Sequence, residues 1–250
     1  MMLLVFLLSY FFSSSPQDEL AAKKDNRLFE LRIYHCERGK LNDLIARFQN
    51  HTTVLFEKHG MTNIGYWVPV KEDNNSLYYV MAYPDLASRE ASWKAFSGDP
   101  VWNEVKKKSE ENGKIVKSVE SVYMNPVDFT PKIRPKASKK ERVFELRIYT
   151  CHPGRLPALE NRFRNHTMKL FKKHGMTNVA YWKSVEKDDA QARLIYFLAH
   201  DSEKAGKTSF EHFGKDPEWI RVREESEKDG KIVQKVESIY MKALSFSPYR

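Results

Sequence analysis

Apolar and polar side chains alternate over Phe29–Tyr34, and the same alternation returns over Phe144–Tyr149. A period of two residues is typical of a β-strand whose two faces meet different surroundings. In the first strand one face carries Phe29, Leu31 and Ile33, and the other carries Glu30, Arg32 and Tyr34. The pattern therefore predicts two equivalent strands, each with one apolar and one polar face.

A helical period follows the first strand. After Gly39, large apolar residues recur at spacings of three and four as far as Phe56, and Gly60 ends the segment. Strands are predicted over 63–68 and 77–83, then a second helical region, then a closing strand over 114–124. Within that helical region Asp99 and Pro100 predict an N-cap and the first residue of a restarted helix.

The whole unit occurs twice. Residues 29–124 return as 144–241 with about half of the aligned positions identical, which indicates a tandem of homologous domains. We expect a signal peptide or N-terminal anchor over 1–26, a first domain over 27–128, a basic proline-containing linker over 129–142 and a second domain over 143–250.

The order βαββαβ predicts an α+β fold built from two ferredoxin-like domains. Such a domain has helices on one face of its antiparallel sheet, and the other face must be covered. Two copies in one chain can turn these uncovered faces on each other, which predicts an intramolecular pseudo-dimeric α/β barrel with a cavity between the sheets. If Phe29, Leu31 and Ile33 pack on the helices, Arg32 and Tyr34 point into that cavity.

Composition adds limits to this picture. The chain has 250 residues, a formal net charge of +9 and 13% aromatic residues, which suits two domains with packed cores. Part of the charge lies over Pro131–Arg142, where no aromatic residue is interleaved, so a solvated linker is favoured over a nucleic-acid or membrane contact. Cys36 and Cys151 occupy equivalent positions, and two packed thiols are favoured over a bridge.

The N-terminus carries a short apolar run, Leu3–Phe12, followed by three serines and a proline. Its length is that of a signal-peptide core and is too short to span a bilayer comfortably. We therefore expect an exported protein, periplasmic or secreted, with an uncleaved membrane anchor as the alternative.

Several repeated motifs resemble the NIPSNAP family. The motifs are Phe-Glu-Leu-Arg-Ile-Tyr at the start of each copy, Asn50-His51-Thr52 with Asn165-His166-Thr167, His59-Gly60-Met61 with His174-Gly175-Met176, and Tyr66-Trp67 with Tyr181-Trp182. The resemblance covers nearly all of residues 29–241 and implies the dimeric α/β-barrel superfamily. That superfamily includes cofactor-free oxygenases, haem-handling enzymes and isomerases, so the resemblance implies a fold more firmly than a reaction.

His51 and His166 are the candidate catalytic residues. Leu44, Phe48, His51 and Leu55 follow helical spacing, which predicts that His51 faces the sheet. An imidazole there could act as a general base, although a buried, hydrogen-bonded structural histidine is the more common outcome.

Six further residues are candidates for ligand binding: Arg32, Tyr34, Trp67, Arg147, Tyr149 and Trp182. An arginine in the predicted cavity could hold a carboxylate or enolate oxygen, and a tyrosine could donate a hydrogen bond. An internal ion pair between Arg32 and Glu30 or Glu120 is an equal alternative. Tryptophan could stack on a planar ligand, although packing on a helix is more common.

No phosphate loop, dinucleotide fingerprint, HExxH or CxxC pair occurs, and we expect no metal, cofactor or nucleic acid. The leading hypothesis is a protein that binds a small, partly apolar or acidic ligand between the two sheets. The alternatives are a cofactor-independent oxygenase or isomerase that uses His51 or His166 with Arg32 or Arg147, and an interaction module without a small-molecule site. A homo-oligomer is a candidate assembly, and a membrane is expected only through an uncleaved N-terminus.

Overall fold

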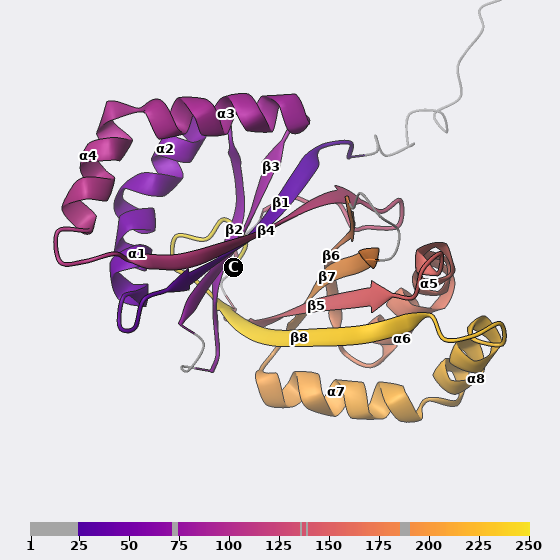
Figure 1. Cartoon of the computed structure of the whole chain (residues 1–250). Coiled ribbons are helices and arrows are strands. Elements are labelled where there is room, and N and C mark those ends of the chain that lie inside the picture. The colour runs from indigo at the N-terminus through magenta and orange to yellow at the C-terminus, as the bar shows by residue number, and fades with distance from the viewer. Residues whose placement is uncertain (1–24, 72–74, 136, 139, 186–190) are drawn as a thin grey trace, which may run out of the picture.

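The computed structural model describes residues 25–71, 75–135, 137–138, 140–185 and 191–250. Both halves have the predicted order of elements, and their eight strands close a single barrel with the helices outside it (Figure 1). The predicted α+β fold and the internal pseudo-dimeric barrel are confirmed.

The first half contains β1 (Leu28–Cys36), α1 (Leu41–Arg47), the π-helical turn η2 (Phe48–Thr52), α2 (Thr53–Lys58), β2 (Thr62–Pro69), β3 (Ser76–Tyr83), α3 (Leu86–Gly98), α4 (Pro100–Ser109) and β4 (Val116–Pro126). The second half contains β5 (Val143–Cys151), α5 (Leu156–Arg162), the π-helical turn η3 (Phe163–Thr167), α6 (Met168–Lys173), β6 (Thr177–Ser184), β7 (Arg193–His200), α7 (Glu203–Lys215), α8 (Pro217–Ser226) and β8 (Val233–Ala243). The predicted N-cap is confirmed, because the Asp99 carboxylate accepts the Val101 N–H at 2.8 Å.

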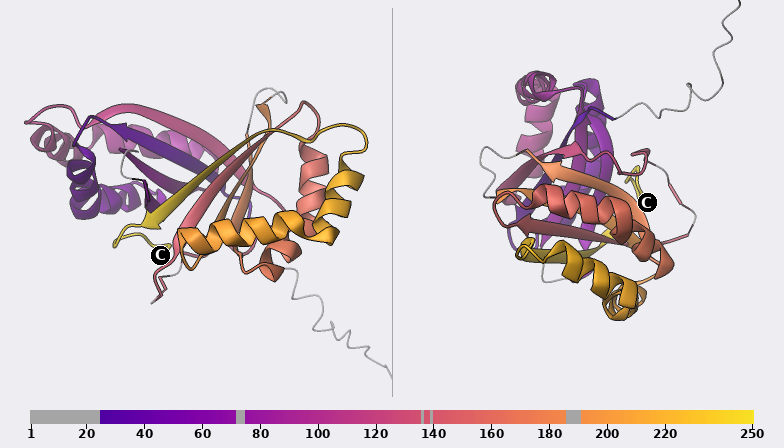
Figure 2. Two further views of the ribbon diagram at one scale, coloured as in Figure 1. Left: turned by 90° about the horizontal axis from the view of Figure 1, so that it is seen from below. Right: turned by 90° about the vertical axis from the view of Figure 1, so that its right-hand side faces the viewer.

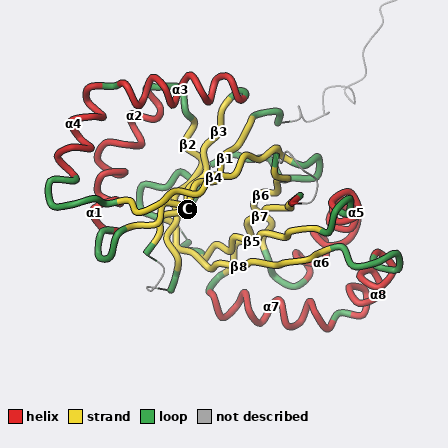
Figure 3. Tube along the Cα trace, viewed as in Figure 1, coloured by secondary structure: helices red, strands yellow, loops and turns green. Residues whose placement is uncertain are grey.

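The strand order around the barrel is β1-β3-β2-β8-β5-β7-β6-β4. The halves therefore meet along two antiparallel seams, β2 with β8 and β4 with β6, where Trp67 pairs with Ala243 and Pro126 pairs with Trp182. Two further views show the helices of each half on the outer side of its own strands (Figure 2), and the strands meet at the centre of the molecule (Figure 3).

The segment that leaves each half packs on the other half. The Tyr181 N–H donates to Thr130 Oγ1 at 2.9 Å, so the chain after β4 lies against the second half. The Tyr66 N–H donates to Ser247 Oγ at 2.9 Å, so the chain after β8 lies against the first. These exchanged segments join the halves in addition to the two seams.

The interior of the barrel is apolar and filled with side chains. Phe29, Leu31 and Ile33 point into it, together with their counterparts from β5, and all six are at most 8% exposed. The predicted side-chain direction on β1 and β5 is therefore wrong, and buried apolar side chains from both halves pack together where the ligand cavity was predicted. The closed barrel excludes water from its interior, so apolar side chains fill it, and the polar residues of each strand face the helices.

The position of His51 also differs from the prediction. In each half the first helical segment, α1-η2-α2 or α5-η3-α6, contains a π-helical turn. In the first half the Thr53 N–H donates to the carbonyl of Phe48, five residues back. This turn accommodates one extra residue and shifts the buried stripe, so Thr52 is 1% exposed whereas His51 is exposed. In the second half Thr167 is buried and His166 is half-buried.

The linker contacts the barrel through Ile133, whereas Lys132, Arg134 and Pro135 beside it are exposed. Ile133 is 4% exposed and belongs to the barrel core, and the guanidinium of Arg27 donates to its carbonyl oxygen. Cys36 and Cys151 are buried and form no disulfide in the described part of the chain, as predicted. The predicted signal peptide or N-terminal anchor covers residues 1–26, of which 1–24 lie outside the described part. None of the described helices is long and apolar enough to cross a membrane.

Candidate functional site

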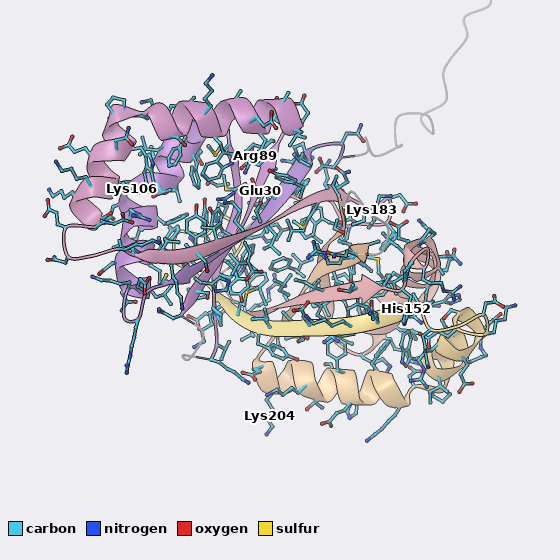
Figure 4. The ribbon with its side chains drawn as sticks, in the orientation of Figure 1. Glu30, Arg89, Lys106, His152, Lys183 and Lys204 are labelled. Carbon is cyan, nitrogen blue, oxygen red and sulfur yellow. The ribbon has the colours of Figure 1, made fainter. Side chains whose placement is uncertain are left out.

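Arg32 and Tyr34 lie between the sheet and the helices of the first half. Arg32 donates to Glu30 Oε1 at 2.6 Å, to the Tyr79 hydroxyl at 2.9 Å and to the Tyr34 hydroxyl at 3.4 Å. Glu30 is fully buried and also accepts from Arg89 of α3, at 2.8 and 3.1 Å (Figure 4). The predicted ion pair of Arg32 with Glu30 is therefore present, beneath α3.

The charges in this network stabilise one another. Burial opposes ionisation of Glu30, but hydrogen bonds from Arg89 and the charge of Arg32 outweigh it and lower the pKa of the carboxyl. Burial likewise opposes the charge of Arg32, but Tyr79, Tyr34 and Glu30 hold the pKa of its guanidinium above the usual value. Both groups stay charged at neutral pH, so Arg32 is already engaged by internal partners.

The second half has a related network with different members. Arg147 donates to Glu145 Oε1 at 2.5 Å and to the Tyr149 hydroxyl at 3.1 Å. His200 replaces Tyr83 and contacts Glu145 Oε2 at 2.8 Å through Nε2. Gly206 stands at the position of Arg89, and a Cβ there would approach the His200 ring to 3.0 Å. The halves have therefore diverged beneath equivalent helices.

Trp67 and Trp182 point into the barrel and join the halves. The Trp67 ring lies 4.8 Å from Phe197 and 5.8 Å from Phe144, measured between centroids, and Trp182 lies 5.5 Å from Phe29. Both indoles are 2% exposed. Their surroundings are those of packed core residues, and a ligand-stacking role for them stays a prediction.

Tyr34 lines a cavity of about 210 Å³ between β1, β4 and the helices of the first half, which we call the inner pocket. Its floor is apolar and aromatic, and Phe48, Phe56 and Phe96 are each at most 3% exposed. The Tyr34 ring packs edge-on against Phe48, with centroids 5.9 Å apart. A tyrosine thus lies between the Arg32 network and an apolar pocket.

The inner pocket also contains charged residues. Arg47 is 5% exposed, pairs with Glu110 at 3.2 Å and lies over the ring of Trp102. Its Nε is buried and has no hydrogen-bond partner in the described part of the chain. Lys106 and Lys114 are exposed and form the rim (Figure 4 labels Lys106). The pocket therefore combines an aromatic floor with an excess of positive charge, and none of the described residues that line it is a histidine.

His51 belongs to a different site, an outer groove of about 510 Å³ between α1, η2 and α4. Arg47 lines both this outer groove and the inner pocket. The structure therefore does not bring His51 together with Arg32, although the sequence pattern predicted a shared cavity. Arg47 was not identified as a site residue from the sequence, because arginine side chains are usually exposed. The sequence feature that could have indicated its burial is its position three residues after Leu44, on the same helix face.

A larger groove of about 860 Å³ lies between the halves, next to the ends of β1 and β4 and to α7. There His35 Nδ1 lies 2.8 Å from Ser76 Oγ, and His35 Nε2 lies 2.6 Å from Glu120 Oε1. Ser76 is 2% exposed, whereas the Glu120 side chain is 63% exposed. This arrangement is poorly suited to nucleophilic catalysis. A substrate must reach the Ser76 hydroxyl, which is buried, and solvent screens the charge of the exposed Glu120 carboxylate.

Metal binding finds little support in the described residues. They contain no group of three or more His, Cys, Asp or Glu side chains placed to hold an ion. The neighbouring residues Cys151 and His152 thus belong to no such cluster, and the absence of a metal or cofactor stays a prediction.

Comparisons with solved structures identify barrels of the same kind. A protein provisionally described as a monooxygenase, from Fusobacterium nucleatum, matches with a TM-score of 0.56 at 10% identity, over 88% of this chain and 93% of its own. An anthrone oxidase-like protein matches with a TM-score of 0.57 at 14% identity, over 90% and 95%. At these identities the likeness establishes the fold alone.

A NIPSNAP domain protein from Burkholderia xenovorans is 24% identical over 42% of this chain and 99% of its own, with a TM-score of 0.37. A comparison with curated protein sequences finds no match. The NIPSNAP family model matches residues 29–131 and again residues 144–248, which together are most of the chain. The protein therefore belongs to the NIPSNAP family and carries two tandem NIPSNAP domains in one barrel.

Proposed function

We propose that the protein binds a small aromatic or branched carboxylic acid in the inner pocket of its first half. The observation that carries the proposal is the pairing of an aromatic floor with an unpaired, buried Arg47 Nε and a lysine rim. Buried donors in proteins are almost always paired, so an unpaired guanidinium nitrogen beside a cavity favours an acceptor in that cavity.

The size and charge of the inner pocket define the ligand class. A volume of about 210 Å³ holds on the order of seven water-sized groups at about 30 Å³ each. The apolar body would contact Phe48 and Trp102, and the carboxylate would face Arg47 or the rim lysines. Such a ligand keeps the predicted chemistry, partly apolar and acidic, but moves it from between the sheets to beneath the helices.

A binding role is favoured over catalysis by the position of the titratable groups. An oxygenase or isomerase of the predicted kind needs a base next to the substrate. His51 is exposed in the outer groove, and the described residues around the inner pocket include no histidine.

Export remains a second part of the proposal, supported by the apolar run Leu3–Phe12. It would put the binding site in the periplasm or the medium.

Calorimetric titration of the full chain with salicylate tests the binding proposal. We expect saturable binding with one site, and about two- to fivefold weaker binding by Lys106→Met, because an exposed charge contact contributes about 0.2–1 kcal/mol. Arg47→Met should weaken binding by about tenfold, because it removes a buried charged donor.

Lys108→Met is the matched control. Lys108 is also exposed and lies on α4, but it lines the outer groove and not the inner pocket. Its replacement lowers the net charge equally and should leave the salicylate affinity unchanged. Equal weakening by the Lys106 and Lys108 variants, or no saturable binding at all, would overturn the proposal.

A further inference from the structure

The linker and the C-terminal segment together form a second, strongly basic cavity. It has a volume of about 610 Å³ and lies at one end of the barrel, between described residues of the linker, the start of β6 and Tyr249–Arg250. We call it the linker pocket. Its cationic residues are Lys132, Arg134, Arg142 and Arg250, and no aspartate or glutamate among the described residues lines it.

The walls of the linker pocket are held in place by the barrel. Ile133 is buried in the barrel core between two of the cationic residues, and Tyr249 packs against the same core. The Ser138 N–H donates to the carbonyl of Arg250 at 2.6 Å, which joins the linker to the C-terminal segment. The site is therefore built by the fold from segments more than a hundred residues apart.

The positive charges in the linker pocket are largely uncompensated. Within the described part of the chain, Lys132, Arg134 and Arg142 form no salt bridge. Asp201 is close enough for Arg142 to lower its pKa, but Lys140 is its direct partner at 2.7 Å and lowers that pKa more strongly. Like charges gathered in this way repel one another, so a bound anion with more than one charge would relieve the repulsion.

An apolar surface lies beside these charges. Phe144 is 3% exposed and lines the linker pocket together with Val179 and Tyr249. The volume of about 610 Å³ corresponds to on the order of twenty water-sized groups. The pocket is therefore large enough for an aromatic body in addition to an anionic group.

We propose that the linker pocket binds a phosphate monoester with an aromatic or similarly apolar body. A phosphate monoester carries up to two negative charges near neutral pH, and the planar guanidinium groups of Arg134 and Arg142 suit its oxygens. A single carboxylate would leave more of the positive charge unbalanced. This site differs in position, size and charge from the inner pocket, so the two proposals stand independently.

Titration of the full chain with 1-naphthyl phosphate tests this inference. Inorganic phosphate probes the anionic group of the ligand alone, and 1-naphthol probes its aromatic body alone. We expect 1-naphthyl phosphate to bind at least about tenfold more tightly than either probe, because charge-assisted and apolar contacts combine only in the complete molecule. Arg134→Gln and Arg142→Gln should each weaken its binding by about tenfold.

Two variants serve as controls. Arg221→Gln removes one positive charge from an exposed residue of α8 and should have no effect. Lys106→Met should leave 1-naphthyl phosphate binding intact, so failure of the inner-pocket proposal can be told apart from failure of this one.

Equal effects of Arg134→Gln and Arg221→Gln would show nonspecific charge attraction and overturn the assignment. Equal affinity for inorganic phosphate and 1-naphthyl phosphate would overturn the apolar part of the ligand. Binding of anionic vesicles or duplex DNA that depends on Arg134, without binding of 1-naphthyl phosphate, would assign the pocket to a macromolecular surface instead.

Discussion

The π-helical turn makes a sharp prediction about two neighbouring residues. Thr52 is 1% exposed and its hydroxyl donates to the Arg47 carbonyl at 3.1 Å, whereas His51 is exposed. In a regular α-helix through Leu44 and Phe48 the positions of these two side chains would be exchanged. Replacing each by alanine therefore tests which of the two faces the sheet.

The expected costs follow from these contacts. Thr52→Ala loses one buried hydrogen bond, worth about 1 kcal/mol, and one buried methyl group, worth about 1 kcal/mol. The better helix propensity of alanine returns about 0.5 kcal/mol, which leaves a net loss of about 1–2 kcal/mol. For a protein of this size that loss lowers Tm by about 2–8 °C. His51→Ala should change stability by less than about 0.5 kcal/mol.

Thermal and urea unfolding followed by circular dichroism measure these differences. Thr167→Ala supplies an internal replicate, because its hydroxyl donates to the Arg162 carbonyl at 3.2 Å in the same way. A loss of about 2 kcal/mol or more in His51→Ala, with Thr52→Ala neutral, would refute the π-helical register and return His51 to the sheet side.

Three further predictions concern buried ionisable groups. Hydrogen bonds from Lys58 and His59 hold the pKa of Asp99 below its usual value, so its stabilisation is complete above about pH 4 and is lost as the pH falls toward the lowered pKa. Asp99→Asn, which keeps the cap, should therefore reduce the dependence of urea stability on pH below about 4. Burial raises the pKa of Cys36 to about 11, so Ellman's reagent at pH 8 should label that thiol only after unfolding. Glu30→Gln should cost about 3–5 kcal/mol in urea unfolding, and more than Glu145→Gln, because Glu30 balances two arginines and Glu145 only one.

The sequence predicts the fold well because the fold depends on repeated, redundant signals. Two copies of a βαββαβ pattern, with caps such as Asp99 and terminating glycines such as Gly60, identify the elements and their pairing. The barrel then follows from the need to cover two sheet faces. The error lay in assigning the two faces of β1, because strict alternation says that the faces differ but not which one meets the helices.

Both faces of β1 are in fact buried. The side toward the barrel carries Phe29, Leu31 and Ile33, whereas the side toward the helices pairs Glu30 with two arginines. A buried polar face that satisfies itself has the same sequence pattern as a polar face that lines a cavity, so the pattern could not separate them. The prediction for His51 was wrong for a local reason. One extra residue in a helical turn rotates the neighbouring side chains around the helix axis, so a different residue faces the sheet.

Covalent tandem duplication explains how the two halves could diverge where they did. Trp67 and Trp182 stay equivalent because each seals the barrel against the other half, and a change in either would open a shared core. Although Tyr66 on the helix side contacts Phe246 of the other half, the Glu30 and Glu145 networks draw their ionic partners from their own half. A substitution there, such as His200 for Tyr83, is compensated locally by Gly206 and does not disturb the seam. The linker pocket is built from the linker and the C-terminal segment and so needs no counterpart, whereas Arg47 of the inner pocket has one in Arg162, whose Nε is also buried and without a partner in the described part of the chain.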